Sequence, residues 1–182
     1  MDRTAAEARD VEPLMTIIET ERLILRRLAS DDAPFIFGLL NDASFIRYIG
    51  DKGVRTLDDA RKYIGTQIAS YERFGFGLYL TLRKEDGAAI GICGLVQRDS
   101  LDDADIGFAF SPAFWSRGYA VESASAVMAY ATNVLRLPRV VAVTDPDNLA
   151  SIRVLETIGL RFSRMARLSA GGPELKLFSS DR

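Results

Sequence analysis

The sequence of 182 residues contains no histidine and a single cysteine, Cys93. The absence of histidine excludes Ser-His-Asp and Cys-His catalysis and histidine-ligated zinc, and it removes the commonest general base at neutral pH. One cysteine can form neither a disulfide within the chain nor a thiolate metal cage. Because Cys93 lies in an apolar run from Ile90 to Val96, we expect a small buried residue, and we expect no metal. Acid–base chemistry must therefore use carboxylates, hydroxyls, amines or water.

The sequence also lacks an excess of basic charge and a sustained apolar run near its start. A formal net charge of −2 argues against a general nucleic-acid binder, which normally carries a basic face. Charged residues such as Arg3, Glu7 and Asp10 interrupt the N-terminal segment, so we expect neither a secretory signal nor a membrane span there. We expect residues 1–16 to be a flexible extension, residues 17–182 to be one domain, and the protein to be cytoplasmic.

Apolar periodicity and turn residues divide the rest of the chain into strands and helices. The predicted strands are 21–28, 76–83, 88–96, 103–110, 139–143, 161–168 and 174–178, and the predicted helices begin near residues 30, 56, 118 and 150. The resulting order, βααβββαβαββ, predicts an α/β (α+β) fold with a mixed, mostly antiparallel sheet and helices on both faces. A ligand would bind where the parallel strands end and their helices begin.

The segment from Ile106 to Glu122 passes from a predicted strand through a short loop into a long helix. Free backbone N–H groups at a helix start, together with the positive end of the helix dipole, form an anion site. Gly118 lets the backbone approach a phosphate closely, and Arg117 can add a charged contact. The alternative is an ordinary turn that Gly118 merely shapes. Neither GxxxxGK[ST] nor GxGxxG after a strand is present, so nucleotide hydrolysis and dinucleotide redox chemistry lack their usual signatures.

Three stretches resemble motifs of the GNAT superfamily of N-acetyltransferases. The run from Phe114 to Ser123 (FWSRGYAVES) resembles motif A, [QR]xxGx[GA], and the run from Asn148 to Phe162 resembles motif B, NxxSxxxLxxxG. The opening TERLILR, residues 20–26, resembles the start of the branch that contains the ribosomal-protein alanine N-acetyltransferases of the RimJ/RimL type. With these motifs in order, the resemblance extends over residues 17–180.

The resemblance implies that the chain uses acetyl-CoA as co-substrate and acetylates a primary amine. In that family the motif A loop binds the pyrophosphate, the motif B helix lies along the other side of the cofactor, and the strand before motif A pairs with the pantetheine arm as an added strand would. One backbone N–H of that strand is the implied oxyanion donor. The implied cofactor-binding residues are Phe108, Ala109, Phe110, Trp115, Ser116, Arg117, Gly118, Tyr119, Ala120, Asn148 and Ser151.

Two positions depart from the general pattern of the superfamily. Trp115 stands where motif A usually begins with Gln or Arg, and an aromatic residue is common there in the RimJ/RimL branch. Leu155 stands where many GNAT enzymes carry the tyrosine that protonates the departing thiolate. The tyrosine mechanism is therefore absent from this chain.

Amine acetylation needs a base for the amine, a donor for the oxyanion and an acid for the thiolate. Ser151 is the candidate acid, because motif B places a hydroxyl near the thioester sulfur in this branch; alternatively it bonds the backbone of the first helical turn. Asp105 is the candidate base, because related sequences often read A-[DE]-I-G there; alternatively it is a solvated strand residue. Other candidates for proton transfer are Glu122, Tyr48, Tyr79, Tyr119 and a water held by backbone carbonyls.

The acceptor amine stays open among three hypotheses. The first acceptor is a protein N-terminus, and the second is a small amine such as a polyamine, an amino acid or an aminoglycoside. The third hypothesis is an acyl-CoA-binding sensor domain without turnover, which the missing tyrosine keeps open. The two helices that shape the acceptor site carry no diagnostic motif. We expect a monomer or homodimer with no nucleic-acid or membrane partner.

Overall fold

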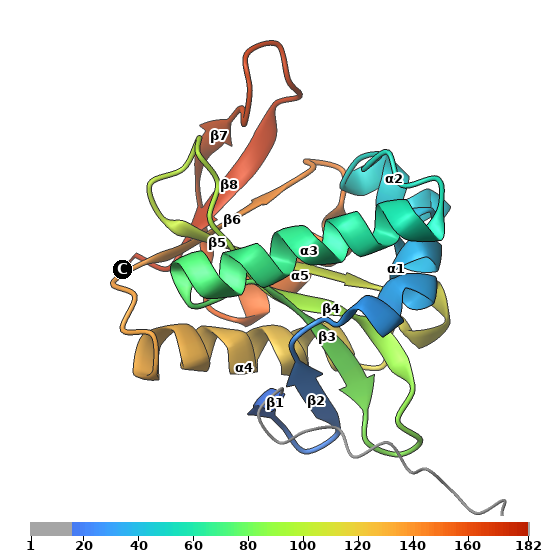
Figure 1. Ribbon diagram of the computed structural model, residues 1–182. Helices are drawn as coiled ribbons and strands as arrows, with labels where there is room; N and C mark the ends of the chain where they lie inside the picture. Colours follow the sequence, from blue (N-terminus) through green and yellow to red (C-terminus); the bar gives the residue numbers. More distant parts are fainter. Residues whose placement is uncertain (1–15, 182) are drawn as a thin grey trace, which may run out of the picture.

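The computed structural model describes residues 16–181 (Figure 1). The strands are β1 (Thr16–Glu19), β2 (Leu23–Arg26), β3 (Leu78–Arg83), β4 (Ala89–Val96), β5 (Ala104–Phe110), β6 (Val140–Thr144), β7 (Arg161–Ala166) and β8 (Leu175–Ser179). The helices are α1 (Ala33–Leu40), α2 (Ala43–Tyr48), α3 (Leu57–Phe74), α4 (Tyr119–Asn133) and α5 (Leu149–Thr157), and short 3-10 helices cover Ser30–Asp32 and Pro112–Phe114. No helix within residues 16–181 is long and apolar enough to cross a membrane.

The strands form one sheet in the order β1-β2-β3-β4-β5-β6-β8-β7. Neighbouring strands are antiparallel except β5 and β6, which run parallel. Parallel neighbours need a crossover connection, and α4 supplies it between these two strands. The predicted fold class, a mixed and mostly antiparallel sheet with helices, is confirmed.

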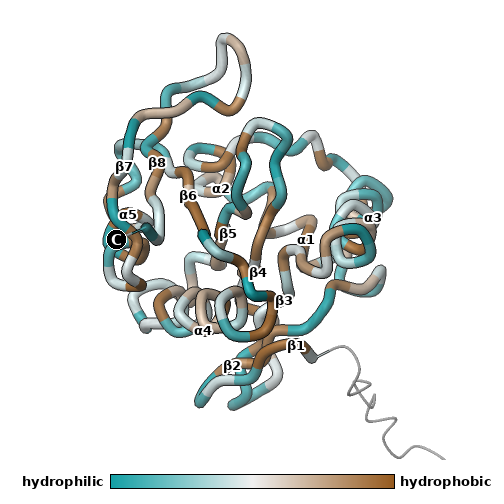
Figure 2. Tube along the Cα trace, turned by 90° about the vertical axis from the view of Figure 1, so that its left-hand side faces the viewer, coloured by the Kyte–Doolittle hydropathy of each residue, from teal (hydrophilic) through white to brown (hydrophobic). Residues whose placement is uncertain are grey.

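Helices cover both faces of the sheet, and each face has its own apolar core (Figures 1 and 2). On one face α1, α2 and α3 pack against the sheet, with Ile64 of α3 in the same cluster as Leu80 of β3. On the other face α4 and α5 pack against it, and Val127 and Leu155 join Ile106 of β5. Because successive residues of a strand point to opposite faces, the central strands contribute to both cores.

The structure adds one strand and one helix to the predicted order. The predicted strand over residues 21–28 is shorter in the structure, where β2 covers Leu23–Arg26. Glu21 and Arg22 lie in a tight turn, in which the Thr20 N–H donates to the Leu23 carbonyl oxygen over 2.9 Å. β1 and β2 therefore pair with each other as an antiparallel hairpin. The prediction also lacks α2, whose six residues are too few for a periodic pattern; Asp42 caps it by accepting the Ser44 N–H at 2.9 Å.

The predicted flexible extension over residues 1–16 lies outside the described residues, apart from its last member. Thr16 belongs to β1 and pairs with Arg26 of β2. Thr16 is therefore part of the sheet.

Candidate active site

The loop between β5 and α4 leaves backbone N–H groups free at the start of the helix. Gly118 is the N-cap residue of α4, with a φ of 81°, and no described side chain caps the helix. Ser116, two residues earlier, also has a positive φ of 59°. The N–H groups of the first turn have no side-chain partner among the described residues, and the helix dipole adds positive potential there. This geometry fits a phosphate group, as the sequence predicts.

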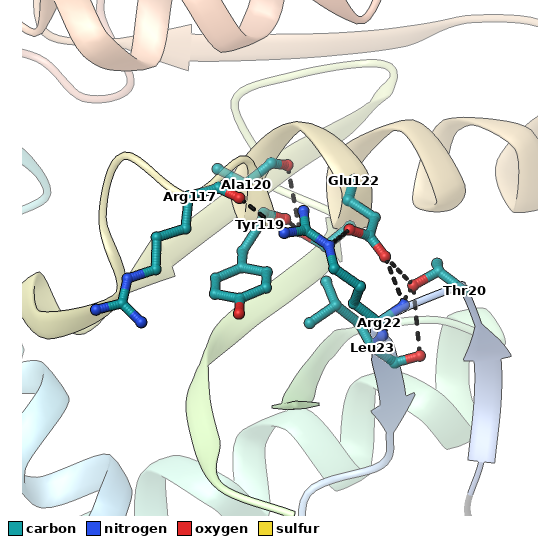
Figure 3. A network of polar contacts seen from close by, with 8 residues as sticks. Thr20, Arg22, Leu23, Arg117, Tyr119, Ala120 and Glu122 are labelled. Carbon is teal, nitrogen blue, oxygen red and sulfur yellow. Dashed lines mark hydrogen bonds and ion pairs between the residues drawn. The ribbon is translucent and has the colours of Figure 1, made fainter. Parts of the chain in front are cut away.

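The residues before Gly118 close the loop and leave one cation at its rim. The indole Nε1–H of Trp115 donates to the Phe110 carbonyl oxygen at 2.7 Å, although the ring itself is exposed. Arg117 is exposed, and Figure 3 shows its guanidinium pointing away from the contacts beneath the helix. Tyr119 is buried, so it offers the site its backbone N–H and not its phenol. The candidate anion site is thus bordered by the Arg117 side chain and by backbone N–H groups, including that of Ala120.

Beneath this loop, Glu122 of α4 is bound to the turn between β1 and β2 (Figure 3). Its carboxylate accepts the Thr20 hydroxyl at 2.7 Å, the Arg22 backbone N–H at 2.9 Å and the Arg22 Nε–H at 2.6 Å. Arg22 also donates from Nη1 to the Arg117 carbonyl oxygen at 2.9 Å, and its guanidinium carbon lies 4.5 Å from the Tyr119 ring centroid. We call the contacts among Thr20, Arg22, Arg117 and Glu122 the β1–β2 brace.

The brace determines the charge state of Glu122. Burial raises the pKa of this carboxyl, but the hydrogen bonds from Thr20 and Arg22 outweigh burial and hold the pKa below its usual range. Glu122 is therefore an ionised carboxylate whose acceptor atoms are occupied. Sequence reasoning considers Glu122 for proton transfer and does not find the brace, although it quotes the TERL stretch that contains half of it.

β5 and β6 separate after a short paired region. β6 pairs with Ala104 and Asp105, whereas β4 pairs with β5 as far as Phe110. From Ile106 onward, the side of β5 that faces β6 has no strand partner among the described residues. The two strands therefore enclose an opening that is closed at Asp105 and widens toward the start of α4.

Alternation along β5 decides which backbone groups face this opening. The Ser111 N–H donates to the Ile90 carbonyl oxygen on β4 at 2.9 Å. In an antiparallel ladder, alternate residues bond the same neighbour. The backbone of Ala109 therefore faces β4, and the backbones of Phe108 and Phe110 face the opening. Of the three strand residues that the resemblance implies as cofactor contacts, Phe108 has both backbone groups available and Phe110 has its N–H, because the Phe110 carbonyl oxygen already accepts the Trp115 indole N–H. The Ala109 groups are already paired.

α5 begins on the α4 side of the sheet with a capped first turn. Asn148 is its N-cap residue, and the Asn148 Oδ1 accepts the Ser151 N–H at 3.2 Å. The Ser151 hydroxyl is half-buried and makes no hydrogen bond to the part of the chain that the structure describes. Because Asn148 satisfies the helix start, the Ser151 hydroxyl remains able to donate to another group.

Asp105 lies at the closed end of the opening, and its side chain is buried. Only 1% of the residue is exposed, which contradicts the alternative of a solvated strand residue. Its Oδ2 accepts the Arg98 Nε–H at 2.5 Å, and its Oδ1 accepts the Val143 N–H at 3.3 Å. Burial raises the pKa of Asp105 to about 6, although the charge and hydrogen bond of Arg98 act in the opposite direction. The carboxyl is ionised at neutral pH and basic enough to accept a proton.

The two candidate proton-transfer groups lie on opposite faces of the sheet. The Asp105 side chain alternates with Ile106, which faces α4 and α5, so Asp105 points toward the face that α1, α2 and α3 cover. Ser151 is on α5, on the other face. Sequence reasoning does not find Arg98, because nothing near it in the chain marks it as the partner of Asp105.

Comparisons with known proteins add an independent line of support. The acetyltransferase (GNAT) domain family matches residues 22–161. The uncharacterized N-acetyltransferase YoaA of Bacillus subtilis (strain 168) is 33% identical over 151 residues, which cover 81% of this chain and 84% of YoaA.

Two solved structures share the fold at low sequence identity. RimL, the ribosomal L7/L12 alpha-N-protein acetyltransferase in complex with coenzyme A, matches with a TM-score of 0.77 at 19% identity, over 89% of this chain and 97% of that chain. The spermidine N-acetyltransferase from Vibrio cholerae matches with a TM-score of 0.73 at 16% identity, over 88% and 95% of the two chains. This chain belongs to the GNAT family and is an acetyltransferase, in a family whose members use acetyl-CoA.

Proposed function

We propose that this acetyltransferase moves the acetyl group of acetyl-CoA to the N-terminal α-amino group of a protein, as a member of the RimJ/RimL branch. The observation that carries the proposal is the opening between β5 and β6. It leads from the free N–H groups at the start of α4 to the buried carboxylate of Asp105. An extended cofactor arm in this opening would join an anion site to a candidate base.

The chain's own groups match the parts of acetyl-CoA, which supplies an activated thioester when bound. The first-turn N–H groups of α4 and the Arg117 side chain would hold the diphosphate. The backbone N–H and carbonyl groups of Phe108 and the N–H of Phe110 would pair with the pantetheine arm. The N–H that lies closest to the thioester would donate to the carbonyl oxygen as negative charge develops on it.

The proton transfers follow from the environments of two side chains. Asp105, with a pKa of about 6, is ionised at neutral pH and would take a proton from the acceptor amine, directly or through one water. The hydroxyl of Ser151 would donate to the departing sulfur, since it has no partner among the described residues. Arg98 holds the carboxylate of Asp105 in place through its 2.5 Å contact.

Charge near Asp105 favours a peptide acceptor over a polyamine. The Arg98 side chain is one-third exposed and lies directly against the candidate base. A polyamine would bring several positive charges close to this guanidinium, and like charges repel. A protein N-terminus brings one amine, which becomes neutral when it loses its proton.

The proposal is tested by acetyl-CoA-dependent release of free thiol with two panels of acceptors. One panel contains peptides that differ in their N-terminal residue, and the other contains spermidine, free amino acids and aminoglycosides. Thiol release with peptides, and mass addition of one acetyl group at their N-terminus, would support the proposal. Thiol release with the small amines alone would overturn the proposal that the acceptor is a protein N-terminus. Binding of coenzyme A without thiol release in either panel would indicate a sensor domain.

A further inference from the structure

The β1–β2 brace links segments of the chain that lie far apart in the sequence. Its hydrogen bonds connect Thr20 and Arg22 with Arg117 and Glu122, at sequence separations of 95 to 102 residues. Figure 3 shows the Arg22 guanidinium beneath the start of α4, against the Tyr119 ring and directly below the loop of the anion site. The functional assignments above use neither Thr20 nor Arg22.

Arg22 fixes the orientation of one peptide group in the anion site. The Arg22 Nη1 donates to the Arg117 carbonyl oxygen at 2.9 Å. Since a trans peptide is planar, its carbonyl oxygen and its N–H point in opposite directions. With the Arg117 carbonyl held toward Arg22, the Gly118 N–H is turned away from the brace and toward the outside of the loop.

The approach of Arg22 depends on the glycine at the N-cap of α4. A Cβ atom at Gly118 would lie 3.2 Å from the Arg22 Nη2, a contact tighter than most that real side chains make. Gly118 also has a φ of 81°, a backbone conformation that residues with a side chain rarely adopt. The same glycine therefore permits both the backbone turn and the close contact with the guanidinium.

Arg22 also balances a negative charge that would oppose a phosphate. Glu122 is ionised and lies in the first turn of α4. Its charge is offset by the Arg22 Nε–H at 2.6 Å. A guanidinium can donate to Glu122 and to the Arg117 carbonyl at once because its N–H groups form a rigid fork, and an ammonium group has no such fork.

We propose that Arg22 is a positioning residue for the diphosphate of the cofactor. It acts by orienting the Arg117–Gly118 peptide and by neutralising Glu122, and it does not take part in proton transfer. The inference rests on the proposed function in one respect, that the anion at the start of α4 is the diphosphate of acetyl-CoA. It also gives a physical role to the TERL stretch, whose first and third residues are Thr20 and Arg22.

The test compares Arg22→Gln and Arg22→Lys with the unaltered protein. Calorimetry gives the Kd for coenzyme A, and initial rates give KM for acetyl-CoA and kcat. We expect Arg22→Gln to raise Kd and KM about tenfold, with kcat at saturating acetyl-CoA changed less than about twofold. Arg22→Lys keeps the charge and loses the fork, so we expect it to recover less than half of the lost affinity on a logarithmic scale. Full recovery by lysine would show a charge effect and overturn the positioning role.

Glu122→Gln separates positioning from direct attraction of the phosphate. If Arg22 acts only through its charge, removing the opposing carboxylate strengthens coenzyme A binding. If Arg22 needs Glu122 to hold the fork in place, the same variant weakens binding several-fold, which is the result we expect. Should Arg22→Gln fail to fold, Thr20→Val keeps Arg22 and removes the 2.7 Å contact to Glu122 together with the hydroxyl's contacts to Leu23, and it should raise KM with kcat unchanged.

Arg61→Gln is the matched control. Arg61 resembles Arg22 in exposure, 47% against 43% of the side chain, and both residues form a 2.6 Å ion pair, but Arg61 lies on α3. The Arg61→Gln variant should bind coenzyme A as the unaltered protein does. An Arg22→Gln Kd within twofold of the control would overturn this inference alone. Absence of coenzyme A binding in the unaltered protein would instead overturn the proposed function.

Discussion

The two helices that flank the opening between β5 and β6 begin in opposite ways. α4 begins at Gly118 with a positive φ and no side-chain cap, whereas α5 begins at Asn148, whose side chain accepts the Ser151 N–H at 3.2 Å. α3, which lies on the other face of the sheet, has a complete capping box formed by Thr56 and Asp59. Relative to glycine at the N-cap, a side-chain cap contributes roughly a few tenths of a kcal/mol. α4 therefore forgoes stability that the other two helices have, and its backbone donors stay available for a ligand.

The difference between the two helix starts predicts that one contributes to cofactor binding and the other to the chemical step. In the proposed function, the N–H groups at α4 would contact a part of acetyl-CoA that does not change during the reaction, so their loss should raise KM and leave kcat unaffected. Asp105 and Ser151 would act on the reacting atoms, so their loss should lower kcat. The changes at Asp105, Gly118 and Ser151 are each expected to alter one of these quantities and to leave the other unchanged, and the change at Asn148 is expected to alter stability alone.

The largest effect is expected for Asp105→Asn, which removes the candidate base. We expect kcat to fall by about 10² or more, the scale of general base catalysis, with an unchanged KM for acetyl-CoA. In the unaltered protein kcat/KM should rise as the pH increases through about 6, because Asp105 must lose its proton to act. Initial rates on both sides of this pH measure the inflection. An inflection that survives in Asp105→Asn would assign the base elsewhere.

The stability of this variant serves as its control. The pKa of Asp105 is about 6 in the folded chain against an ordinary value of 3.8, so the folded state holds the proton more tightly. The resulting stabilisation is present at low pH and is lost as the pH rises from about 4 to 6. At neutral pH, asparagine removes a buried charge, and the thermal midpoint should not fall enough to explain the loss of activity.

Gly118→Asp would make the start of α4 resemble that of a capped helix. The new carboxylate can accept the first-turn N–H groups, and its charge repels a phosphate, so we expect KM for acetyl-CoA to rise about a hundredfold. Gly118→Asn is the matched variant, because asparagine also tolerates a positive φ but carries no charge. We expect a smaller rise, about tenfold. Equal coenzyme A affinity in the two variants would show that no anion binds at this helix start.

Both helix starts could be predicted from the sequence because their signals are local. Gly118 follows a predicted strand by a few residues, and Asn148 stands three positions before Ser151. The strands around them are likewise predicted by alternation and turns, and the observed sheet confirms the fold class. In physical terms, each of these features depends on the conformational preferences of neighbouring residues.

Contacts between distant segments could not be predicted in this way. The predicted strand over residues 21–28 takes in Glu21 and Arg22, which belong to the turn, because Glu122, the partner of this turn, lies 100 positions or more away. In its own strand Asp105 could be the candidate base or a solvated residue, and only the folded structure shows it buried beside Arg98. The sequence therefore indicates which residues belong to the candidate site, but the structure is needed to determine their charge state and hydrogen-bond partners.

Ser151→Ala tests the proposed proton donor to the departing sulfur without disturbing the cap of α5. Asn148 binds the Ser151 backbone N–H, so alanine keeps this hydrogen bond and loses only the free hydroxyl. We expect kcat to fall about tenfold, with unchanged KM for acetyl-CoA and unchanged thermal midpoint. Ser151→Thr keeps a hydroxyl and should retain more activity than the alanine variant. Full kcat in Ser151→Ala across the pH range would remove serine from the mechanism.

The smallest effect is expected for Asn148→Ala, which removes the cap of α5. Loss of the cap should destabilise the protein by about 1 kcal/mol and lower the thermal midpoint by about 2–4 °C. Asn148→Asp keeps an oxygen acceptor and should restore the midpoint. Saturating coenzyme A raises the midpoint of any variant that still binds it. If the cap is purely structural, coenzyme A should raise the midpoints of Asn148→Ala and the unaltered protein equally. A smaller rise in Asn148→Ala would mean that the start of α5 also holds the cofactor, and the contrast between the two helix starts would then be one of degree.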